Sequence, residues 1–389
     1  MRIFVLGAGM MGRAVVHDLG GAPEVKSIIV ADFERDRASA VAREFGRGKA
    51  RAVFADVNRT KHLAGLLRGS DVVVNCTQYN KNLEAMRAAL AARVNYMDLG
   101  GLYHMTRKQF SLDREFRRIG RIAIAGMGGA PGITNVMARA LADPMHRVDA
   151  IRVYNAGADQ QRYESPIAYT FSIATILDEL TMPPVMFEGG RYVEKPMLSE
   201  PEPGKFRAPI GSIVLRHSIH SELGTLPGSF RKKGIKDVFF KINYDPKLVN
   251  LVRDLDQAGF TSREPVAVNG TSVAPRAVLL ALMQTRATKK TPLDVEALRV
   301  VVTGTVRERG RSRRVASAME MWADHSTRPQ LSAVARDTGF PAAIAAVMLG
   351  RGEIRGVGVQ APENVVPPEP FFAQLKKRGF TFRRWNFKD

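Results

Sequence analysis

The first 32 residues constrain the fold of this chain more than any other stretch. Residues 2–6 are a short run that is apolar after Arg2, as in a buried parallel strand, and the motif G-A-G-M-M-G at 7–12 follows them directly. The residues after the motif, to about position 19, have the pattern of a helix. A strand, a G-x-G-x-x-G turn and a helix in this order are typical of a dinucleotide-binding unit.

Each glycine of the motif has a separate role in such a unit. Gly7 allows the tight turn out of the strand, Gly9 lets a pyrophosphate approach the backbone, and Gly12 lets the helix pack closely on the strand. The helix begins at Met10 and Met11, so its N-terminal N–H groups and the positive end of its dipole point toward the phosphates. We therefore predict that all five residues bind the cofactor. A purely structural strand-turn-helix is the alternative.

A second predicted strand, residues 26–31, ends in Asp32, twenty residues after Gly12. A carboxylate at this point accepts hydrogen bonds from the ribose hydroxyls and repels a 2′-phosphate, so the sequence favours NAD over NADP. Arg35 and Arg37 follow closely and could hold a phosphate, which keeps NADP possible.

The alternation of apolar strands and amphipathic helices continues to about residue 125 and makes six β-α units. We predict an α/β fold with an N-terminal Rossmann domain, whose doubly wound parallel sheet has the strand order 3-2-1-4-5-6. Ligands of such sheets lie across the carboxyl ends of the strands. The further cofactor-binding candidates follow the third, fourth and fifth strands, and they are Asp56, Val57, Cys76, Thr77 and Gly100.

A glycine- and proline-rich loop at 126–132 ends this pattern, and a strand-rich region with few β-α repeats follows. Its sharpest signal is a hairpin of two long strands, 298–306 and 314–322, which could pair across a homodimer. A long apolar helix at 331–349 needs partners on several sides, so the C-terminal segment should return to the first domain. We expect an NAD(P)-binding Rossmann domain (1–130), an α+β substrate-binding and dimerisation domain (131–330) and C-terminal helices that pack back on the Rossmann domain (331–389).

Composition excludes several classes of protein. The single cysteine rules out an intramolecular disulfide and a cysteine-rich metal site, and no metal is expected. No signal peptide precedes the first strand and no apolar run approaches membrane-spanning length, so we expect a cytoplasmic protein without a membrane partner. The net charge of +20 is dispersed, with its densest clusters at 231–233, 307–314 and 376–384. No nucleic-acid-binding motif accompanies it, so no specific nucleic-acid partner is expected.

Several motifs spread over the chain carry a family resemblance. They are the glycine motif at 7–12, Val72-Val73-Val74-Asn75, Met97-Asp98-Leu99-Gly100-Gly101, Gly129-Ala130-Pro131-Gly132 followed by Asn135, and Leu349-Gly350-Arg351-Gly352 with Pro367-Pro368. Together they resemble the saccharopine dehydrogenase-like family, and within it lysine 6-dehydrogenase. The resemblance implies hydride transfer between NAD(P) and a carbon that bears nitrogen.

For this chain the resemblance implies an NAD-dependent oxidoreductase acting on the C–N bond of a lysine-like amino acid, with formation of an imine. A saccharopine or carboxynorspermidine dehydrogenase/reductase, which joins two substrates, is the alternative among enzymes. A non-catalytic NAD-binding sensor protein is the alternative from another class. The second domain departs from the family at 154–157 and 241–244, which leaves the substrate open.

Amine oxidation needs a proton acceptor and an anchor for the substrate carboxylate. Arg216 is a candidate anchor through bidentate pairing, and an imidazole near it titrates close to neutral pH. Tyr154 could hydrogen-bond the amine, and Asp98, at the end of the fifth strand, could relay a proton. A purely structural role is the alternative for each. We predict Asp98, Tyr154 and His217 as catalytic residues and Arg216, His220, Lys241 and Asn135 as substrate-binding residues.

Overall fold

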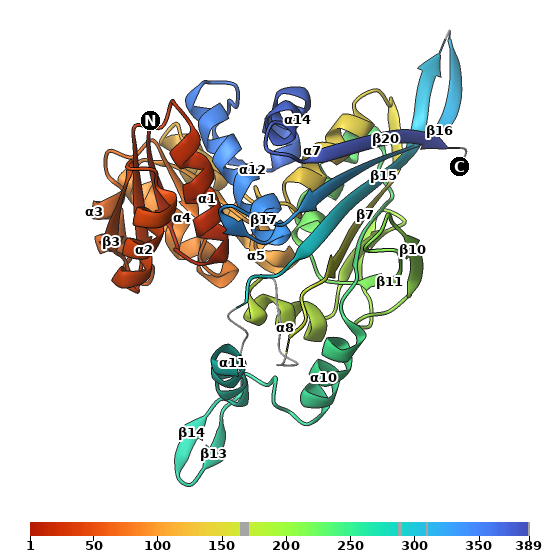
Figure 1. Cartoon of the computed structure of the whole chain (residues 1–389). Coiled ribbons are helices and arrows are strands. Elements are labelled where there is room, and N and C mark those ends of the chain that lie inside the picture. Colours follow the sequence, from red (N-terminus) through yellow and green to blue (C-terminus); the bar gives the residue numbers. More distant parts are fainter. Residues whose placement is uncertain (164–170, 287–289, 309, 388–389) are drawn as a thin grey trace.

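Two β-sheets organise the computed structural model, which describes residues 1–163, 171–286, 290–308 and 310–387 (Figure 1). The first sheet is parallel and seven-stranded, with the order β19-β6-β5-β4-β1-β2-β3. Its first six strands have the predicted order 3-2-1-4-5-6, so the doubly wound Rossmann sheet is confirmed. The strands are β1 (Arg2–Leu6), β2 (Ser27–Asp32), β3 (Ala50–Phe54), β4 (Val72–Asn75), β5 (Asn95–Asp98), β6 (Ile122–Ile124) and β19 (Gly358–Gln360).

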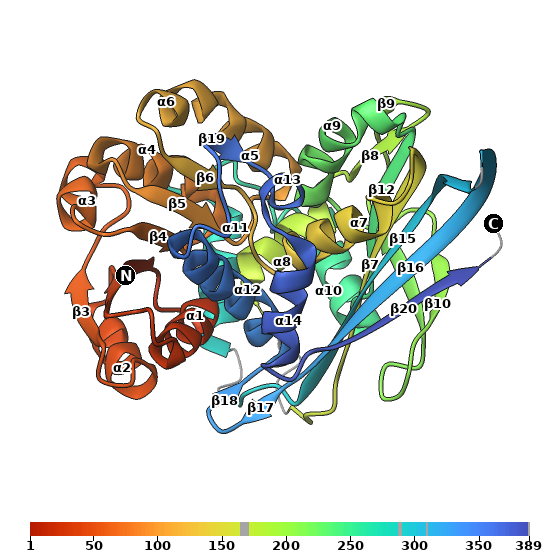
Figure 2. The same cartoon turned by 90° about the horizontal axis from the view of Figure 1, so that it is seen from above.

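Helices cover both faces of this sheet (Figure 2). Because side chains alternate along a strand, Ile3 and Val5 enter one core while Phe4 and Leu6 enter the other. The first core packs on α1 and α2, and the second on α3, α4 and α6. The helices are α1 (Met10–Gly21), α2 (Arg35–Phe45), α3 (Thr60–Leu67), η1 (Tyr79–Lys81), α4 (Asn82–Ala92), α5 (Leu102–Gln109), η2 (Phe110–Leu112) and α6 (Asp113–Arg118).

The second sheet is mixed and nine-stranded, and the chain reaches it through α7 (Ile133–Ala142). Its main path is β10-β11-β12-β7-β15-β16-β20, with β8 paired to β12 and β9 paired to β8. Only the β12–β7 pair is parallel among the pairs that the structure describes. The strands are β7 (Arg147–Asp159), β8 (Val185–Glu188), β9 (Arg191–Glu194), β10 (Glu202–Lys205), β11 (Ser212–His217), β12 (Asp237–Ile242), β15 (Asp294–Glu308), β16 (Arg311–Asp324) and β20 (Thr381–Phe387).

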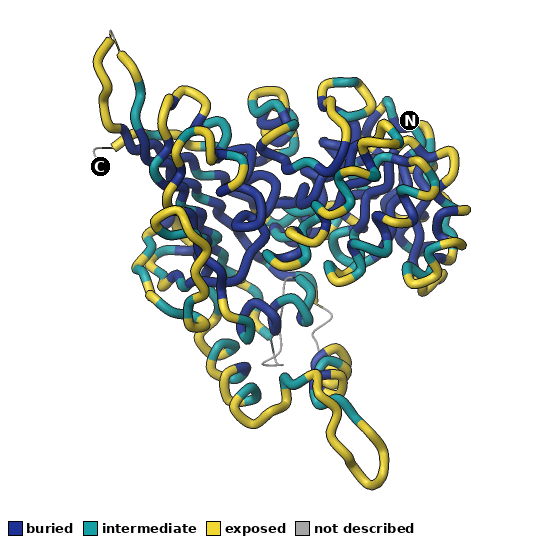
Figure 3. The backbone as a smooth tube through the Cα atoms, turned by 180° about the vertical axis from the view of Figure 1, so that it is seen from behind, coloured by how far each residue is buried: buried dark blue, intermediate teal, exposed yellow. Residues whose placement is uncertain are grey.

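Short elements connect the strands of the second sheet. They are α8 (Ile173–Thr181), η3 (Ser221–Gly224), α9 (Leu226–Ser229), η4 (Arg231–Lys233), α10 (Pro246–Gln257), β13 (Val266–Val268), β14 (Thr271–Val273) and α11 (Pro275–Arg286). The elements from α10 to α11 project away from the two sheets, and most of their surface is exposed (Figures 1 and 3).

The C-terminal segment joins the two sheets. Its long helix α12 (Ala333–Gly350) is buried on nearly all sides and packs against α1, where Gly339 lies against the Ala14 side chain. Strand β19 extends the parallel sheet, whereas β20 pairs with β16 of the second sheet. The segment therefore returns to the Rossmann domain, as expected, and also completes the second sheet. Its remaining elements are β17 (Ser326–Thr327), β18 (Gln330–Leu331), α13 (Pro362–Val365) and α14 (Pro368–Lys376).

Among the described residues, no helix is both long and apolar enough to cross a membrane.

Candidate active site

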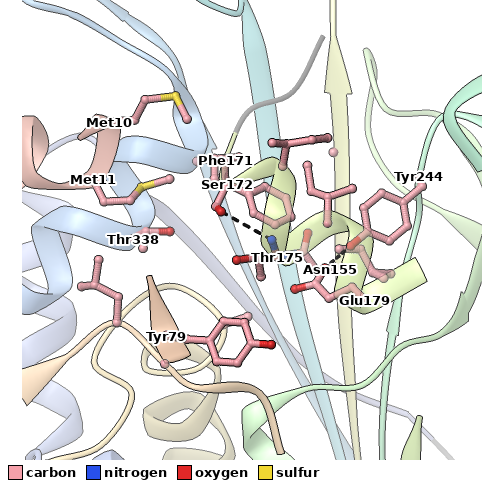
Figure 4. A pocket seen from close by; sticks show the side chains of 18 of the residues that line it. Met10, Met11, Tyr79, Asn155, Phe171, Ser172, Thr175, Glu179, Tyr244 and Thr338 are labelled. Carbon is pink, nitrogen blue, oxygen red and sulfur yellow. Dashed lines mark hydrogen bonds between the residues drawn. The ribbon is translucent and has the colours of Figure 1, made fainter. Parts of the chain in front are cut away.

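A cleft of about 2470 Å³ lies between the two sheets, at the carboxyl ends of the parallel strands. Both halves of the molecule line it. Figure 4 shows Met10, Met11 and Thr338 on one side, with Glu179, Asn155 and Tyr244 on the other. Among the predicted cofactor residues, those that line the cleft are Gly7, Gly9, Met10, Met11, Asp32, Asp56, Val57, Cys76, Thr77 and Gly100.

The glycine turn has the shape that a dinucleotide needs. A Cβ on Gly9 would meet no atom within 4 Å, so the backbone there opens onto free space. Gly12 does not line the cleft, and a Cβ on it would lie 2.0 Å from the Gly7 carbonyl oxygen. The first position thus leaves room for a pyrophosphate, and the second brings the helix against the strand. The residues present therefore fit a pyridine dinucleotide.

Asp32 is held firmly at the adenosine end of the cleft. Its two carboxylate oxygens accept hydrogen bonds from the backbone N–H groups of Ala8 (2.8 Å) and Glu34 (2.9 Å). Arg37 lies 3.7 Å from the same carboxylate and stacks over the exposed ring of Phe33. The carboxylate favours NAD, while the nearby guanidinium is the group that a 2′-phosphate would recruit.

Removing the negative charge of Asp32 should therefore change cofactor choice. In Asp32→Asn, we expect kcat/KM with NAD(H) to fall about tenfold and the preference for NAD(H) over NADP(H) to fall about 10- to 100-fold, because a charged hydrogen bond contributes about 1.5–3 kcal/mol. Initial rates with both cofactors measure this. Arg37→Gln is the matched variant, and it should lower activity with NADP(H) only. An unchanged ratio in Asp32→Asn would contradict the role of Asp32.

Asp98 organises the loops behind the cleft rather than lining it. Its buried carboxylate accepts hydrogen bonds from the Gly100 N–H (2.9 Å), the Gly126 N–H (2.8 Å) and the Gln109 amide (2.5 Å). Burial raises the pKa of Asp98, and these donors oppose the shift. Its predicted part in proton transfer has no support from this placement, because the side chain points into the protein.

The second sheet turns three predicted residues away from the cleft. Tyr154 and Lys241 both contact Glu202, at 3.0 and 2.8 Å, on the outer face of the sheet. His217 contacts Glu200 at 3.0 Å on that same side. None of these three lines the cleft, so the predicted catalytic and substrate-binding roles are not supported at these positions. Since successive side chains on a strand face opposite ways, their neighbours Asn155, Arg216 and Ile242 line the cleft instead.

Asn135 is also absent from the cleft lining. It lies buried at the start of α7, where it accepts a hydrogen bond from the Gly132 N–H (3.0 Å) and donates to Glu363 (2.8 Å) and Thr225 (3.1 Å). Its side chain therefore ties the glycine-proline loop to the C-terminal segment, outside the cleft lining.

Of the two predicted histidines, His220 is the one that reaches the cleft. Its Nδ1 contacts the buried Glu222 carboxylate, whose other oxygen accepts a hydrogen bond from the Thr134 hydroxyl (2.7 Å). Its ring stacks on Phe240, with 3.7 Å between ring centroids. The neighbouring Ser221 accepts a hydrogen bond from the Gly101 N–H (3.0 Å), which places this loop against the end of β5.

The ionisation of His220 follows from its neighbours. Burial alone lowers the pKa of an imidazole, but the charge and hydrogen bond of Glu222 and the charges of Glu179 and Glu296 outweigh burial and raise the pKa of His220. A histidine that is held on one nitrogen by a carboxylate and opens to a cleft on its other side is suited to general acid and base catalysis.

Three carboxyl groups that the sequence analysis missed form an acidic wall of the cleft: Glu179, Glu296 and Asp337. Burial raises the pKa of Glu179 to about 7, and it also raises the pKa of Glu296 and Asp337. The Tyr244 hydroxyl donates to Glu179. Glu296 and Asp337 also share a hydrogen bond, which lowers the pKa of Glu296 and raises that of Asp337, so the two carboxyl groups hold a proton between them.

One signal of the acidic wall was present in the sequence. Asp337 is an acid within the long apolar helix α12, and Glu296 interrupts the apolar strand β15. A buried acid in such surroundings is retained only where it is paired or functional. No pattern in the sequence indicates that α8, β15 and α12 bring these three residues to one wall.

The two halves of the chain match two parts of one enzyme family. Residues 3–124 match the saccharopine dehydrogenase NADP binding domain, and residues 128–380 match the saccharopine dehydrogenase C-terminal domain. The chain belongs to the saccharopine dehydrogenase family. This confirms the resemblance seen in the sequence motifs, and it makes the protein a pyridine-nucleotide-binding oxidoreductase of that family.

Two relatives match over nearly their full length. The chain is 24% identical to carboxyaminopropylagmatine dehydrogenase of Synechocystis sp., over 97% of this chain and 96% of that protein. It is 25% identical to carboxynorspermidine synthase of Vibrio cholerae, over 97% of this chain and 95% of that protein.

Two solved structures share the fold. The saccharopine dehydrogenase (L-Glu forming) of Saccharomyces cerevisiae superposes with a TM-score of 0.75 over the whole of both chains, at 17% identity. The homospermidine synthase of Legionella pneumophila, solved in complex with NAD, superposes with a TM-score of 0.67 at 12% identity, over 99% of this chain and 91% of that one.

Proposed function

We propose that this protein is an NAD(P)H-dependent reductase that joins an amino-acid aldehyde to an amine and reduces the resulting imine to a secondary amine. The observation that carries this proposal is the acidic wall of Glu179, Glu296 and Asp337, which faces the cofactor half of the cleft. Buried carboxyl groups that share a proton suit the ammonium group of an amine substrate, because a cation beside them stabilises their charged forms.

The other end of such a product carries a carboxylate, for which Arg216 is the proposed anchor. Arg216 lines the cleft, and no ion pair to it occurs among the described residues. The names of both relatives describe a carboxyl-bearing group attached to a polyamine or to agmatine, which agrees with a cleft that is acidic at one wall and basic at another.

The proposed mechanism uses His220 as the proton donor. The amine nitrogen adds to the aldehyde carbon, and the imidazolium of His220 donates a proton to the hydroxyl group as it leaves as water. A nicotinamide cofactor, which the glycine turn at 7–12 and Asp32 would hold, would supply the hydride that reduces the C=N carbon to the secondary amine. Glu222 keeps the ring oriented and stabilises its protonated form.

Lysine 6-dehydrogenase activity is the second candidate. The turn Ala130-Pro131-Gly132 favours it, since that turn resembles lysine 6-dehydrogenase and differs from the Asp-Pro-Gly of saccharopine reductases. The same His220 would then accept a proton from the ε-ammonium group of lysine. The presence of titratable groups in the cleft argues against a non-catalytic sensor protein.

A two-arm assay distinguishes these functions. In one arm, NADH or NADPH is mixed with an amino-acid semialdehyde and a diamine or agmatine, and loss of nicotinamide absorbance is followed together with the product mass. In the other arm, lysine and NAD are supplied alone. Secondary-amine formation supports our proposal, and lysine oxidation without a second substrate supports the alternative. Cofactor binding without turnover in either arm would overturn both.

A further inference from the structure

A hydrogen bond joins the two halves of the molecule across the cleft. On the Rossmann side, η1 follows β4, and its first residue, Tyr79, lines the cleft. The Tyr79 hydroxyl donates to Asp178 Oδ2 (2.6 Å), and Asp178 lies on α8 of the second half. Figure 4 shows the Tyr79 side chain reaching from the Rossmann side toward the second half. The bond therefore connects a cofactor-side segment with a substrate-side helix, 99 residues apart along the chain.

Asp178 is held in place by the second half of the molecule. Its Oδ1 accepts hydrogen bonds from Arg276 (2.6 Å) and Arg263 (2.8 Å), and Arg276 also donates to the Ala174 carbonyl one turn earlier in α8 (2.9 Å). Both arginines bond to Oδ1, so Oδ2 is the oxygen that meets Tyr79. Burial and the hydrogen bond to this carboxylate raise the pKa of Tyr79, so its hydroxyl stays protonated and remains the donor.

On the Rossmann side, residues that line the cofactor part of the cleft hold the segment that carries Tyr79. Asp56 lines the cleft, and its Oδ1 accepts hydrogen bonds from the N–H and the side-chain amide of Asn58, both at 2.9 Å. Asn58 Oδ1 in turn accepts from Lys81 Nζ (2.7 Å), and Lys81 ends η1. Thr77, two residues before Tyr79, also lines the cleft. A dinucleotide that contacts Asp56 and Thr77 therefore restrains Tyr79 from both ends of its segment.

On the substrate side, Asp178 directly precedes Glu179 of the acidic wall. The Glu179 side chain lines the cleft and accepts a hydrogen bond from the Tyr244 hydroxyl. Helix α8 has nine residues, so a movement of the helix at Asp178 also moves Glu179. The bond between Tyr79 and Asp178 therefore sets the position of this carboxyl group relative to the cofactor half of the cleft.

We propose that Tyr79 and Asp178 are positioning residues, through which a bound pyridine dinucleotide holds α8, and with it Glu179, in place for the amine substrate. The dinucleotide restrains the segment of Tyr79, and the hydrogen bond to Asp178 passes this restraint to α8. Less freedom of α8 is then lost when the amine binds, so the amine binds more tightly to the cofactor complex than to the free protein. This inference rests on the proposed function for the identity of the amine, whereas the contact can be tested with the cofactor alone.

The test compares two variants that each lose one hydroxyl group. Tyr79→Phe removes the donor to Asp178 and leaves both arginines on that carboxylate. Tyr154→Phe is the matched control, because the Tyr154 hydroxyl also donates to a carboxylate, Glu202 (3.0 Å), but outside the cleft. Hydrogen-deuterium exchange of α8 is measured by mass spectrometry in the full-length proteins, with and without saturating NADH or NADPH. Cofactor titration gives the affinity of each variant.

In the unmodified protein and in Tyr154→Phe, the cofactor should slow exchange in α8 by about tenfold, within the range of about 5- to 150-fold that is typical of coupled sites. In Tyr79→Phe, the cofactor should still slow exchange in the glycine turn at 7–12 but leave exchange in α8 unchanged. Equal slowing of α8 in Tyr79→Phe, or no slowing in the unmodified protein, would overturn the proposal. Loss of cofactor binding in Tyr79→Phe would also overturn it, because Tyr79 would then act on the cofactor itself.

A kinetic measurement adds a readout that a loss of stability would not produce. With the substrates that the two-arm assay identifies, Tyr79→Phe should raise KM for the amine about tenfold while KM for the cofactor stays within about twofold. An equal rise of both constants would contradict the positioning role. If neither arm of that assay shows turnover, the proposed function fails, and the exchange comparison still decides whether cofactor binding restrains α8 through Tyr79.

Discussion

Replacing His220 by glutamine should lower kcat/KM by about 10²- to 10⁴-fold, the range that a positioned general acid or base contributes. Glutamine keeps a polar side chain in the space against Phe240 but cannot exchange a proton at neutral pH. Steady-state rates with the substrate pair that the two-arm assay identifies measure the loss. Titration with NAD(H) should show unchanged cofactor affinity, because His220 contacts none of the glycine-turn residues.

His217→Gln is the matched control for this experiment. His217 lies three residues away on the outer face of the sheet, paired with Glu200, so its loss should leave kcat/KM within about twofold of the unmodified enzyme. A large loss in His217→Gln, or a small one in His220→Gln, would contradict the assignment of the proton donor.

The pH profile separates a catalytic from a structural role of the pair His220–Glu222. Reduction requires the imidazolium form, so its rate should fall as pH rises through the raised pKa of His220, and the oxidative direction should show the opposite dependence. Glu222→Gln removes the main group that raises this pKa. Its reductive profile should therefore fall off at lower pH than that of the unmodified enzyme. An unchanged profile with reduced thermal stability would mean that Glu222 acts only on the fold.

Removing the acidic pair with Glu296→Gln and Asp337→Asn should raise KM for the amine substrate by about 100-fold. Two buried carboxyl groups of the acidic wall are lost, and a hydrogen bond to a charged group contributes about 1.5–3 kcal/mol. KM for the aldehyde and the affinity for NAD(H) should change little. Glu194→Gln with Glu264→Gln, two exposed acids outside the cleft, is the control of equal charge.

The same double variant should be more stable than the unmodified protein. Burial raises the pKa of Glu296 and Asp337 above their values in the unfolded chain, so between those values the folded state binds more protons. Stability at these sites is then highest at low pH and falls as pH rises through the window. Thermal melts of the unmodified protein between about pH 5 and 8 should show this decline, and the double variant should show a weaker one. A lower melting temperature in the variant at pH 8 would show that the pair serves the fold.

The cofactor half of this protein was predictable because its signals are local. Gly7, Gly9 and Gly12 act through backbone geometry over six residues, and the structure shows the open space at Gly9 and the close contact at Gly12 that their spacing implies. The position of Asp32 was predictable for the same reason. It ends strand β2, and the carboxyl end of that parallel strand lies at the edge of the sheet where the adenosine half of a dinucleotide is expected. The order of the six strands also follows from general rules of right-handed β-α-β connection.

The substrate half was less predictable because the sequence does not show which face of the second sheet lines the cleft. Tyr154 and Asn155, or Arg216 and His217, are neighbours in sequence, yet only one of each pair lines the cleft. Both faces of the second sheet are largely covered, so hydrophobic alternation gives no sign of which face meets the cofactor. The sequence therefore identified the right strand ends but not which of the neighbouring side chains face the cofactor.

The sequence by itself determined the Rossmann fold, the cofactor class and the family, since each depends on short motifs with defined spacing. Only the tertiary structure decided which groups meet the substrate. Glu179, Glu296 and Asp337 come from a helix, a strand and a second helix that lie far apart along the chain, and α12 must return to the first domain before they form one wall. Contacts between segments that are distant along the chain form such a site, and these contacts produce no periodic pattern in the sequence.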